Sequence, residues 1–350
     1  MSQTARYANV MVKVGSERSA LLSEDKLKML TEHRNLKEFV SDLREIALQE
    51  KIDKLQPPIT SRKLEKLFRE DQVESYCKMV QSVPDTVFQF LKIYIQKFEY
   101  ENLKTILKAV NAGLTNKETL NRILLPAEDF LGNHDLFERI TAAIDVKAVV
   151  GMMQETVYTE VLNAALRRYE ETKSLQFFDV LLDKMYYENF TEAFKKLPTK
   201  EQKTAFLYAS LDADGFALLA ILRGKALNHD PHWIRLAIPR VHLNITGITV
   251  EAIITAEDFE HALGIVVESS YGRYFTKAET LETAIAKAEQ ALKKARFEHA
   301  RKSRIKDTFS IGTPLGFMVQ KEAETYNLIA VSLGIEYGWA SEQILQTLLL

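Results

Sequence analysis

The chain has 350 residues, 46% of them hydrophobic, so it is long enough to bury two or three cores. Its 46 Lys and Arg against 48 Asp and Glu give a net charge of −2, which argues against nucleic acid as the main partner. One cysteine, Cys77, excludes an internal disulfide and indicates a reducing compartment.

The first half of the chain is predicted to be helical after a short β-branched stretch at 7–14. Pro57 and Pro58 mark a turn, because neither fits a helix interior. Gly113 is placed to stop a helix, and the segment 115–118 reads as a capping box that opens the next one. The helices predicted from apolar spacing and from these stops cover 23–49, 64–83, 85–112 and 115–126.

The second half is also predicted to be helical. A second capping box is expected at 199–202, and 229–239 reads as a turn-rich link. The segment 241–254 has a strand-like composition, but we interpret it as mostly helical. The segments with helical spacing are 134–171, 177–186, 199–227, 281–305, 314–333 and a short helix from 341. The scarcity of glycine (13) and proline (8) fits an all-α protein.

One pattern occurs three times: an acid, a small or amide residue three places on, an apolar cluster and then, in two copies, a base. Residues three and four apart share one helix face, so the acid and the amide lie beside an apolar stripe. We interpret them as polar ties between packed helices; the alternative is a threefold set of binding carboxylates. The middle copy has Ala217 in place of the amide. Helix packing tolerates such a replacement better than a binding site would. The polar residues assigned as ties are Glu99, Asn102, Asp214, Arg223, Glu324 and Asn327.

The three copies suggest an internal threefold repeat. They begin 115 and 110 residues apart, close to thirds of the chain. A second landmark, Leu124-Leu125-Pro126, recurs as Ala237-Ile238-Pro239. We therefore predict three similar helical domains, at 1–115, 116–230 and 231–350.

Residues able to carry catalysis are scarce. Gly224-Lys225 lacks the rest of a phosphate-binding loop, and the calcium-like start at Asp212 has Arg223 at its twelfth position instead of Glu. His229 and His232 have metal-like spacing but no Cys or Glu cluster beside them. No nucleophile is paired with a base. We predict no catalytic, cofactor-binding or metal-binding residue, and therefore no enzyme.

No targeting segment is predicted. Residues 1–6 have no apolar signal core, and the best apolar stretch, 315–335, is interrupted by Lys321, Glu322 and Glu324. We expect a soluble protein that meets a membrane only through partners.

The largest local charge imbalance lies near the end of the 281–305 helix. One interpretation is a solvated face, because cations are favoured near a helix C-terminus. The other is an electrostatic dock for an acidic partner surface. The basic residues are Lys293, Lys294, Arg296, Arg301, Lys302, Arg304 and Lys306.

Several segments resemble one known family. The similarity is to the C subunit of archaeal A-type ATP synthases, and it is carried by 7–16 with 21–23, by 182–187, by the stretch from Asp214 to Lys225 and by the stretch from Pro314 to Asn327. Its eukaryotic counterpart is the d subunit of the vacuolar-type ATPase. The resemblance covers nearly the whole chain as scattered motifs, and Ala217 departs from the family's Asn.

The resemblance implies an all-α, funnel-shaped, non-catalytic protein with three similar domains around a pseudo-threefold axis. Such a protein is a central-stalk adaptor between the rotor stalk and the membrane proteolipid ring. It transmits torque for proton or sodium transport coupled to ATP, and lies in the cytoplasm on the inner face of the cell membrane. The alternatives are a generic cytosolic α-helical scaffold, whose repeats are typically about 30–50 residues, and an all-α metal-dependent enzyme.

Overall fold

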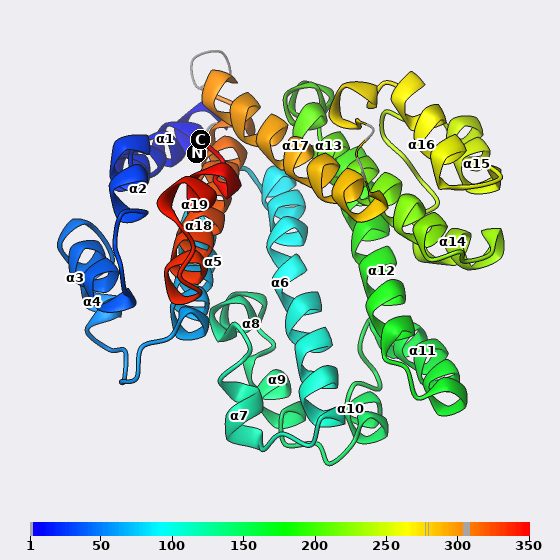
Figure 1. Cartoon of the computed structure of the whole chain (residues 1–350), viewed down its shortest axis with the longest axis horizontal. Helices are drawn as coiled ribbons and strands as arrows, with labels where there is room; N and C mark the ends of the chain where they lie inside the picture. Colours follow the sequence, from blue (N-terminus) through cyan, green and yellow to red (C-terminus); the bar gives the residue numbers. More distant parts are fainter. Residues whose placement is uncertain (1–2, 277, 279, 304–308) are drawn as a thin grey trace. The chain divides into compact units, whose positions relative to one another are not determined.

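The computed structural model describes residues 3–276, 278, 280–303 and 309–350. These residues form helices joined by turns, with no strand among them, which confirms the all-α prediction (Figure 1). The longer helices are α1 (Gln3–Ser19), α5 (Ser61–Val80), α6 (Asp85–Asn111), α11 (Thr159–Thr172), α12 (Gln176–Lys195), α13 (Thr199–Ala226), α17 (Leu281–Lys302) and α18 (Gly312–Glu336). The shorter ones are α2 (Glu24–Leu30), α3 (Leu36–Ile46), α4 (Gln49–Ile52), α7 (Asn116–Leu120), α8 (Leu125–Leu131), α9 (His134–Ile140), α10 (Val146–Met152), α14 (Pro231–Ala237), α15 (Gly247–Thr255), α16 (Phe259–Glu268), η1 (Gly272–Tyr274) and α19 (Ser341–Thr347).

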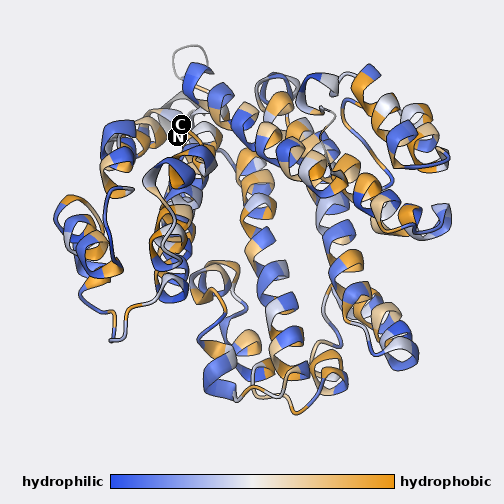
Figure 2. Ribbon diagram, in the orientation of Figure 1, coloured by the Kyte–Doolittle hydropathy of each residue, from blue (hydrophilic) through white to orange (hydrophobic). Residues whose placement is uncertain are grey.

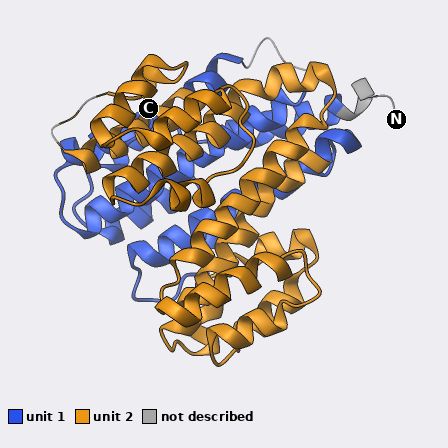
Figure 3. Cartoon of the chain, turned by 90° about the vertical axis from the view of Figure 1, so that its right-hand side faces the viewer, with its two compact units in different colours: residues 1–88, 297–350 blue, residues 89–296 orange. Residues whose placement is uncertain are grey.

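The chain forms two compact units, which Figure 3 distinguishes by colour. Unit 1 comprises residues 1–88 and 297–350, and unit 2 comprises 89–296. In unit 1, α5 packs along α18, and the Tyr76 hydroxyl donates to the Met318 carbonyl oxygen at 2.6 Å. A buried cluster that includes Phe39, Phe68 and Val331 joins α3, α5 and α18.

Unit 2 contains two kinds of packing. Aromatic rings join α6 to α12, with the Phe90 and Phe190 centroids 5.2 Å apart. Aliphatic residues join α13 to α15, α16 and α17. Figure 2 shows hydrophilic and hydrophobic residues interleaved along α6 and α12, as expected for helices with one buried stripe.

Helix α13 corrects the sequence prediction that no segment is long and apolar enough to cross a membrane. It is the one helix in the described part of the chain that meets this criterion. However, 72% of its apolar window is buried inside the protein. Burial in the core of unit 2 therefore accounts for its hydropathy.

The N-terminal region is more divided than its apolar spacing predicts. The β-branched stretch at 7–14 lies inside α1, and the single helix predicted over 23–49 is three helices. Ser23 caps α2 at the predicted start. The pattern then breaks where Asn35 starts α3 by accepting main-chain N–H groups and where Leu48, in the left-handed region (φ 58°), precedes α4.

Two further predictions need correction. The capping box expected at 199–202 is absent: Pro198 is the N-cap of α13, and the Gln202 amide instead donates to the carbonyls of Lys195 and Leu197, both at 2.8 Å. The segment 241–254 is helical only from Gly247, because its first residues form an irregular connection. The capping box at 115–118 is present as predicted.

The ends of α6, α13 and α18 share one turn geometry. Each is followed by a residue in the left-handed region: Gly113 (φ 70°), Asn228 (φ 55°) and Gly338 (φ 69°). The next residue donates its main-chain N–H to the carbonyl five residues earlier, at 3.0, 2.9 and 2.8 Å respectively. A short helix then begins in each case: α7, α14 or α19. These turns recur at the same offsets, 115 and 110 residues, as the three sequence motifs.

Candidate functional site

The first motif copy lies on α6 inside unit 2. The Asn102 side chain is buried; its Oδ1 accepts the Leu124 N–H at 2.7 Å and its Nδ2 donates to the Leu124 carbonyl at 3.1 Å. Nδ2 also donates to Glu128 Oε1 on α8 at 2.6 Å. One turn earlier, Glu99 Oε1 accepts from Asn133 Nδ2 at 2.6 Å. Asn102 therefore fixes the connection between α7 and α8 to the long helix.

The second copy uses its acid for the same task. Asp214 on α13 is 0% exposed, and its Oδ1 accepts the Leu243 N–H at 2.8 Å. Its Oδ2 accepts the Asn244 and Ile245 N–H groups at 2.7 and 3.0 Å and the Tyr271 hydroxyl at 2.8 Å. Burial, followed by the charge of Asp214, raises the pKa of Tyr271 far above its usual range. The segment after α14 is thus held by one carboxylate.

The third copy lies on α18 in unit 1. Asn327 accepts the Leu349 N–H at 2.8 Å and donates to the Leu349 carbonyl at 3.0 Å. Glu324 accepts the Leu22 N–H at 2.7 Å through Oε1 and pairs with Lys321 Nζ at 2.7 Å through Oε2. Burial by itself lowers the pKa of Lys321, but the carboxylates around it outweigh that effect and raise it.

Arg223, assigned as a tie, lies on the outer side of α13. Its Nη2 is 2.7 Å from Glu289 Oε2 on α17, and its side chain is 48% exposed. An exposed ion pair of this kind contributes little to stability. The acid and amide positions, in contrast, are buried in every copy.

The basic residues of α17 divide between the two units. Lys293 pairs with Glu289 at 2.8 Å and Lys302 with Glu298 at 3.4 Å, while Lys294 is exposed. The Arg301 guanidinium lies over the Phe297 ring, 5.7 Å from its centroid. Arg304 and Lys306 lie outside the described residues.

Arg296 does not belong to an exposed basic surface. It is 8% exposed, and its Nη2 donates to the Tyr94 hydroxyl at 2.6 Å and lies 3.5 Å from Asp212 Oδ2. Tyr187 also donates to Asp212, at 3.3 Å. Arg296 therefore joins α17 to α6 and α13 inside unit 2, while α12 is attached to the same group through Asp212, and we remove Arg296 from the docking set.

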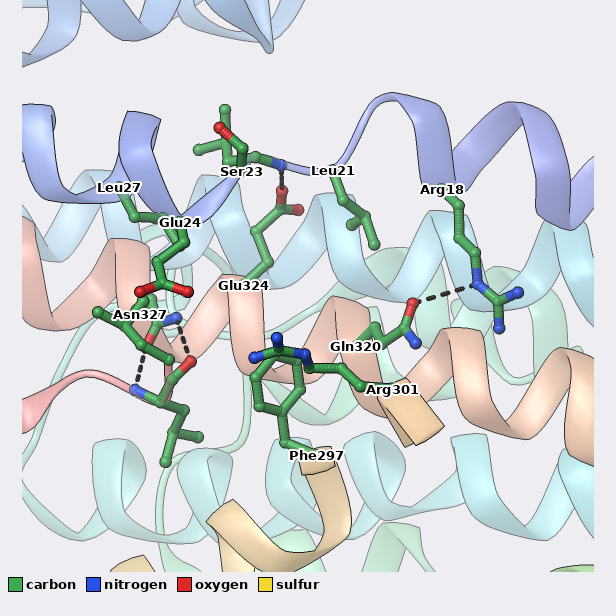
Figure 4. A pocket seen from close by; sticks show the side chains of 13 residues that line it. Arg18, Leu21, Ser23, Glu24, Leu27, Phe297, Arg301, Gln320, Glu324 and Asn327 are labelled. Atoms are coloured by element: carbon green, nitrogen blue, oxygen red, sulfur yellow. Dashed lines mark hydrogen bonds between the residues drawn. The ribbon is translucent and has the colours of Figure 1, made fainter. Parts of the chain in front are cut away.

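A pocket of about 370 Å³ in unit 1 brings together three residues from the sequence prediction, Arg301, Glu324 and Asn327 (Figure 4). Leucines from α2 and the C-terminal segment line its apolar side. Arg18 Nε donates to Gln320 Oε1 at 3.1 Å beside it. Arg18 and Gln320 were not predicted from the sequence, because residues 302 positions apart meet only in the folded chain.

The described part of the chain contains no group of three or more His, Cys, Asp or Glu side chains that could hold a metal ion. His229 stacks on Trp233, with centroids 4.0 Å apart, in the turn before and the first turn of α14. The buried acids and amides of the three motif copies bind main-chain atoms and neighbouring side chains, an arrangement suited to holding helices together.

Comparison with known proteins gives one consistent result. A family model described as ATP synthase (C/AC39) subunit matches residues 10–347. Similar relatives are named as the C subunit of A-type ATP synthase. The protein of Methanocaldococcus jannaschii is 27% identical over 94% of this chain and 83% of its own length. That of Methanothermobacter thermautotrophicus is 27% identical over 93% and 82%, and that of Thermococcus onnurineus is 24% identical over 97% and 88%. With a match that spans almost all of its residues, the chain belongs to the ATP synthase (C/AC39) subunit family and is a structural, non-catalytic subunit of such a complex.

Proposed function

We propose that this chain is the central-stalk adaptor of a rotary A/V-type ATP synthase. It links the rotor stalk to the membrane proteolipid ring and transmits torque between ion transport and ATP chemistry. The observation that carries the proposal is the family match over residues 10–347, with relatives named as the C subunit of A-type ATP synthase. The same proposal places the chain on the inner face of the cell membrane, attached through its partners.

The internal ties support a mechanical role. A protein that transmits torque needs stiff long helices and fixed connections between them. In this chain the buried Asn102, Asp214 and Asn327 each fix the connection that follows a short helix to a long one. Arg296 on α17 likewise binds Tyr94 on α6 and lies beside Asp212 on α13 within unit 2. Buried polar groups that are hydrogen-bonded across helices in this way favour one arrangement of those helices.

We also propose that the chain consists of three similar repeats, 1–115, 116–230 and 231–350. The recurrence of left-handed turns at Gly113, Asn228 and Gly338 supports this division. Superposing α6, α13 and α18 with the short helices after them tests it. Failure of those short helices to overlay would argue against an internal threefold relation.

The adaptor role is tested by capture and by add-back. An affinity-tagged chain should bring down the stalk and ring subunits from detergent-solubilised membranes. Adding the pure chain to complexes stripped of it should restore ATP-driven ion pumping. Recovery of the tagged chain without any other component of an ATP synthase would favour the alternative, a generic helical scaffold.

The exposed basic residues of α17 are the proposed dock for an acidic partner surface. Figure 4 shows the Arg301 guanidinium at the edge of the unit 1 pocket, beside Phe297. Charges that dock a partner steer assembly and weaken with salt, because the screening length is about 8 Å at physiological ionic strength. The dock would comprise Lys293, Lys294, Arg301, Lys302 and Arg304. Of these five, Arg304 lies outside the described residues.

The test replaces Arg301 and Lys302 together by Glu. Assembly with the stalk and membrane sectors should weaken at low salt and differ less from wild type at high salt. The matched control replaces Lys196 and Lys200, two exposed lysines at the turn between α12 and α13, by Glu. Equal assembly of both folded variants at low salt would identify the basic residues as an ordinary solvated face.

A further inference from the structure

Two carboxyl groups are buried near one another in the first motif copy. Glu128 on α8 is 0% exposed and Glu99 on α6 is 1% exposed. Each has one oxygen that accepts a side-chain amide at 2.6 Å, from Asn102 and Asn133 respectively. The other oxygen of each, Oε2, has no hydrogen-bond partner among the described residues. Two ionised carboxylates in this arrangement would carry a large desolvation cost.

The charged and titratable groups around Glu128 do not offset that cost. Glu99 faces it from α6 and Asp129 follows it on α8, and both are acids. The Asp129 carboxylate is 2.5 Å from Nδ1 of His134, on α9. Tyr158, before α11, interacts with Glu99. Within the described part of the chain no cationic side chain is paired with Glu128.

The ionised form of Glu99 is stabilised by more neighbouring groups than the ionised form of Glu128 is. Burial raises the pKa of Glu99 as well and outweighs the lowering effect of the Gln96, Tyr158 and Asn133 side chains and of the Lys92 charge, but Glu99 has more such groups near it than Glu128 has. Glu128 has the single amide donor of Asn102 against burial and two like charges, and its pKa is raised to about 8. A neutral acid with one unbonded oxygen costs far less to bury than an ion does.

We propose that Glu128 is a proton-binding site of the folded chain, occupied at neutral pH, and that loss of this proton loosens α8 from α6. No catalytic step uses this proton. It neutralises a carboxyl group that Asn102 holds against α6. Every group around Glu128 that is named above lies within unit 2.

The direction of the pH effect follows from linkage. The folded state holds the proton to a higher pH than the unfolded state does. The stabilisation is therefore complete below the ordinary glutamate pKa and is lost as the pH rises toward about 8. Over that interval the unfolding equilibrium constant contributed by this group rises about tenfold per pH unit.

The test compares the full-length wild type with Glu128→Gln, which mimics the neutral acid. Urea unfolding is measured at several pH values from about 5 to about 9, a range that brackets the proposed titration. The stability of Glu128→Gln relative to wild type should increase steadily up to a pH of about 8. The control is Glu170→Gln, an exposed residue on α11, which should keep a constant difference from wild type. A constant difference for Glu128→Gln as well would overturn the proposal.

A second measurement does not require that the variant fold. Carboxyl-labelled glutamate in the wild-type chain is titrated by NMR, with Glu99→Gln as an aid to assignment. One glutamate carboxyl group should still be protonated near pH 7, which is about 3 units above the ordinary pKa of glutamate. Ordinary titration of every glutamate would show that Glu128 is ionised in the folded state and would refute the inference.

Discussion

Replacement of Asp214 by Asn should be one of the most destabilising single changes in this chain. The carboxylate is 0% exposed and accepts four hydrogen bonds, three of them from the consecutive N–H groups of 243–245. Asn has nearly the same shape, but it carries no charge and has an NH₂ group where one oxygen stood. In the better amide orientation the three bonds to the Oδ2 position survive as neutral bonds, and the Leu243 N–H faces another donor.

The magnitude follows from those four bonds. A hydrogen bond to a charged group contributes about 1.5–3 kcal/mol and a neutral one about 1 kcal/mol, while an unpaired buried donor costs about 1–3 kcal/mol. Weakening three bonds and orphaning one donor should lower the free energy of unfolding by roughly 3–5 kcal/mol. That is a large share of the roughly 5–15 kcal/mol typical of a whole domain.

The matched control for this change is Asp230→Asn. Asp230 is an exposed N-cap that accepts the Trp233 N–H at 3.0 Å, and Asn serves that position about as well. Urea unfolding of both variants gives the comparison, and amide exchange should accelerate at 243–245 in Asp214→Asn alone. A loss in Asp214→Asn that stays within about 1 kcal/mol of the control would refute the assignment of this carboxylate as the anchor of the segment.

Three further changes test other parts of the same design. Asn327→Leu strands the buried N–H and carbonyl that it binds, and should lower stability by roughly 1–3 kcal/mol in chemical unfolding; an unchanged midpoint would count against the tie. Gly338→Ala forces a side chain into the left-handed region and should cost about 1–2 kcal/mol; Gly338→Asn should cost less, because Asn228 occupies the equivalent turn. Gly334→Ala places a Cβ atom 2.5 Å from Ile344 Cγ1 and should lower the melting temperature; the same change should cost less in an Ile344→Ala background than in the wild type, and an equal cost in both would contradict the clash.

The long helices could be predicted because their signals are local. Apolar spacing, the glycine at 113 and the capping box at 115–118 lie within a few residues of the ends they define. The short helices near the N-terminus were merged because their apolar spacing continues across the breaks. The breaks are set by the Asn35 side chain, which caps α3 by accepting main-chain N–H groups, and by the left-handed backbone of Leu48 before α4.

The burial of the candidate site residues could not be predicted from the sequence around them. Arg296 sits in a run of basic residues and reads as surface, but its partners Tyr94 and Asp212 come from distant helices. The sequence pattern does not single out Glu128. The available signal was an acid directly after an apolar stretch, and its meaning depends on Asn102, 26 residues earlier. Burial of polar groups is decided by tertiary partners, which helical spacing does not identify.

The middle motif copy explains why Ala217 does not break the pattern. An amide can both donate and accept, so Asn102 and Asn327 each bind both main-chain groups of a single residue. A carboxylate can only accept, so it needs several N–H groups that converge on one point. The chain provides them at 243–245, and the acid that receives them, Asp214, lies one helical turn before Ala217 on the same face of α13. The tie has therefore moved by one turn and changed its chemistry, while the segment it secures has kept its place after the short helix.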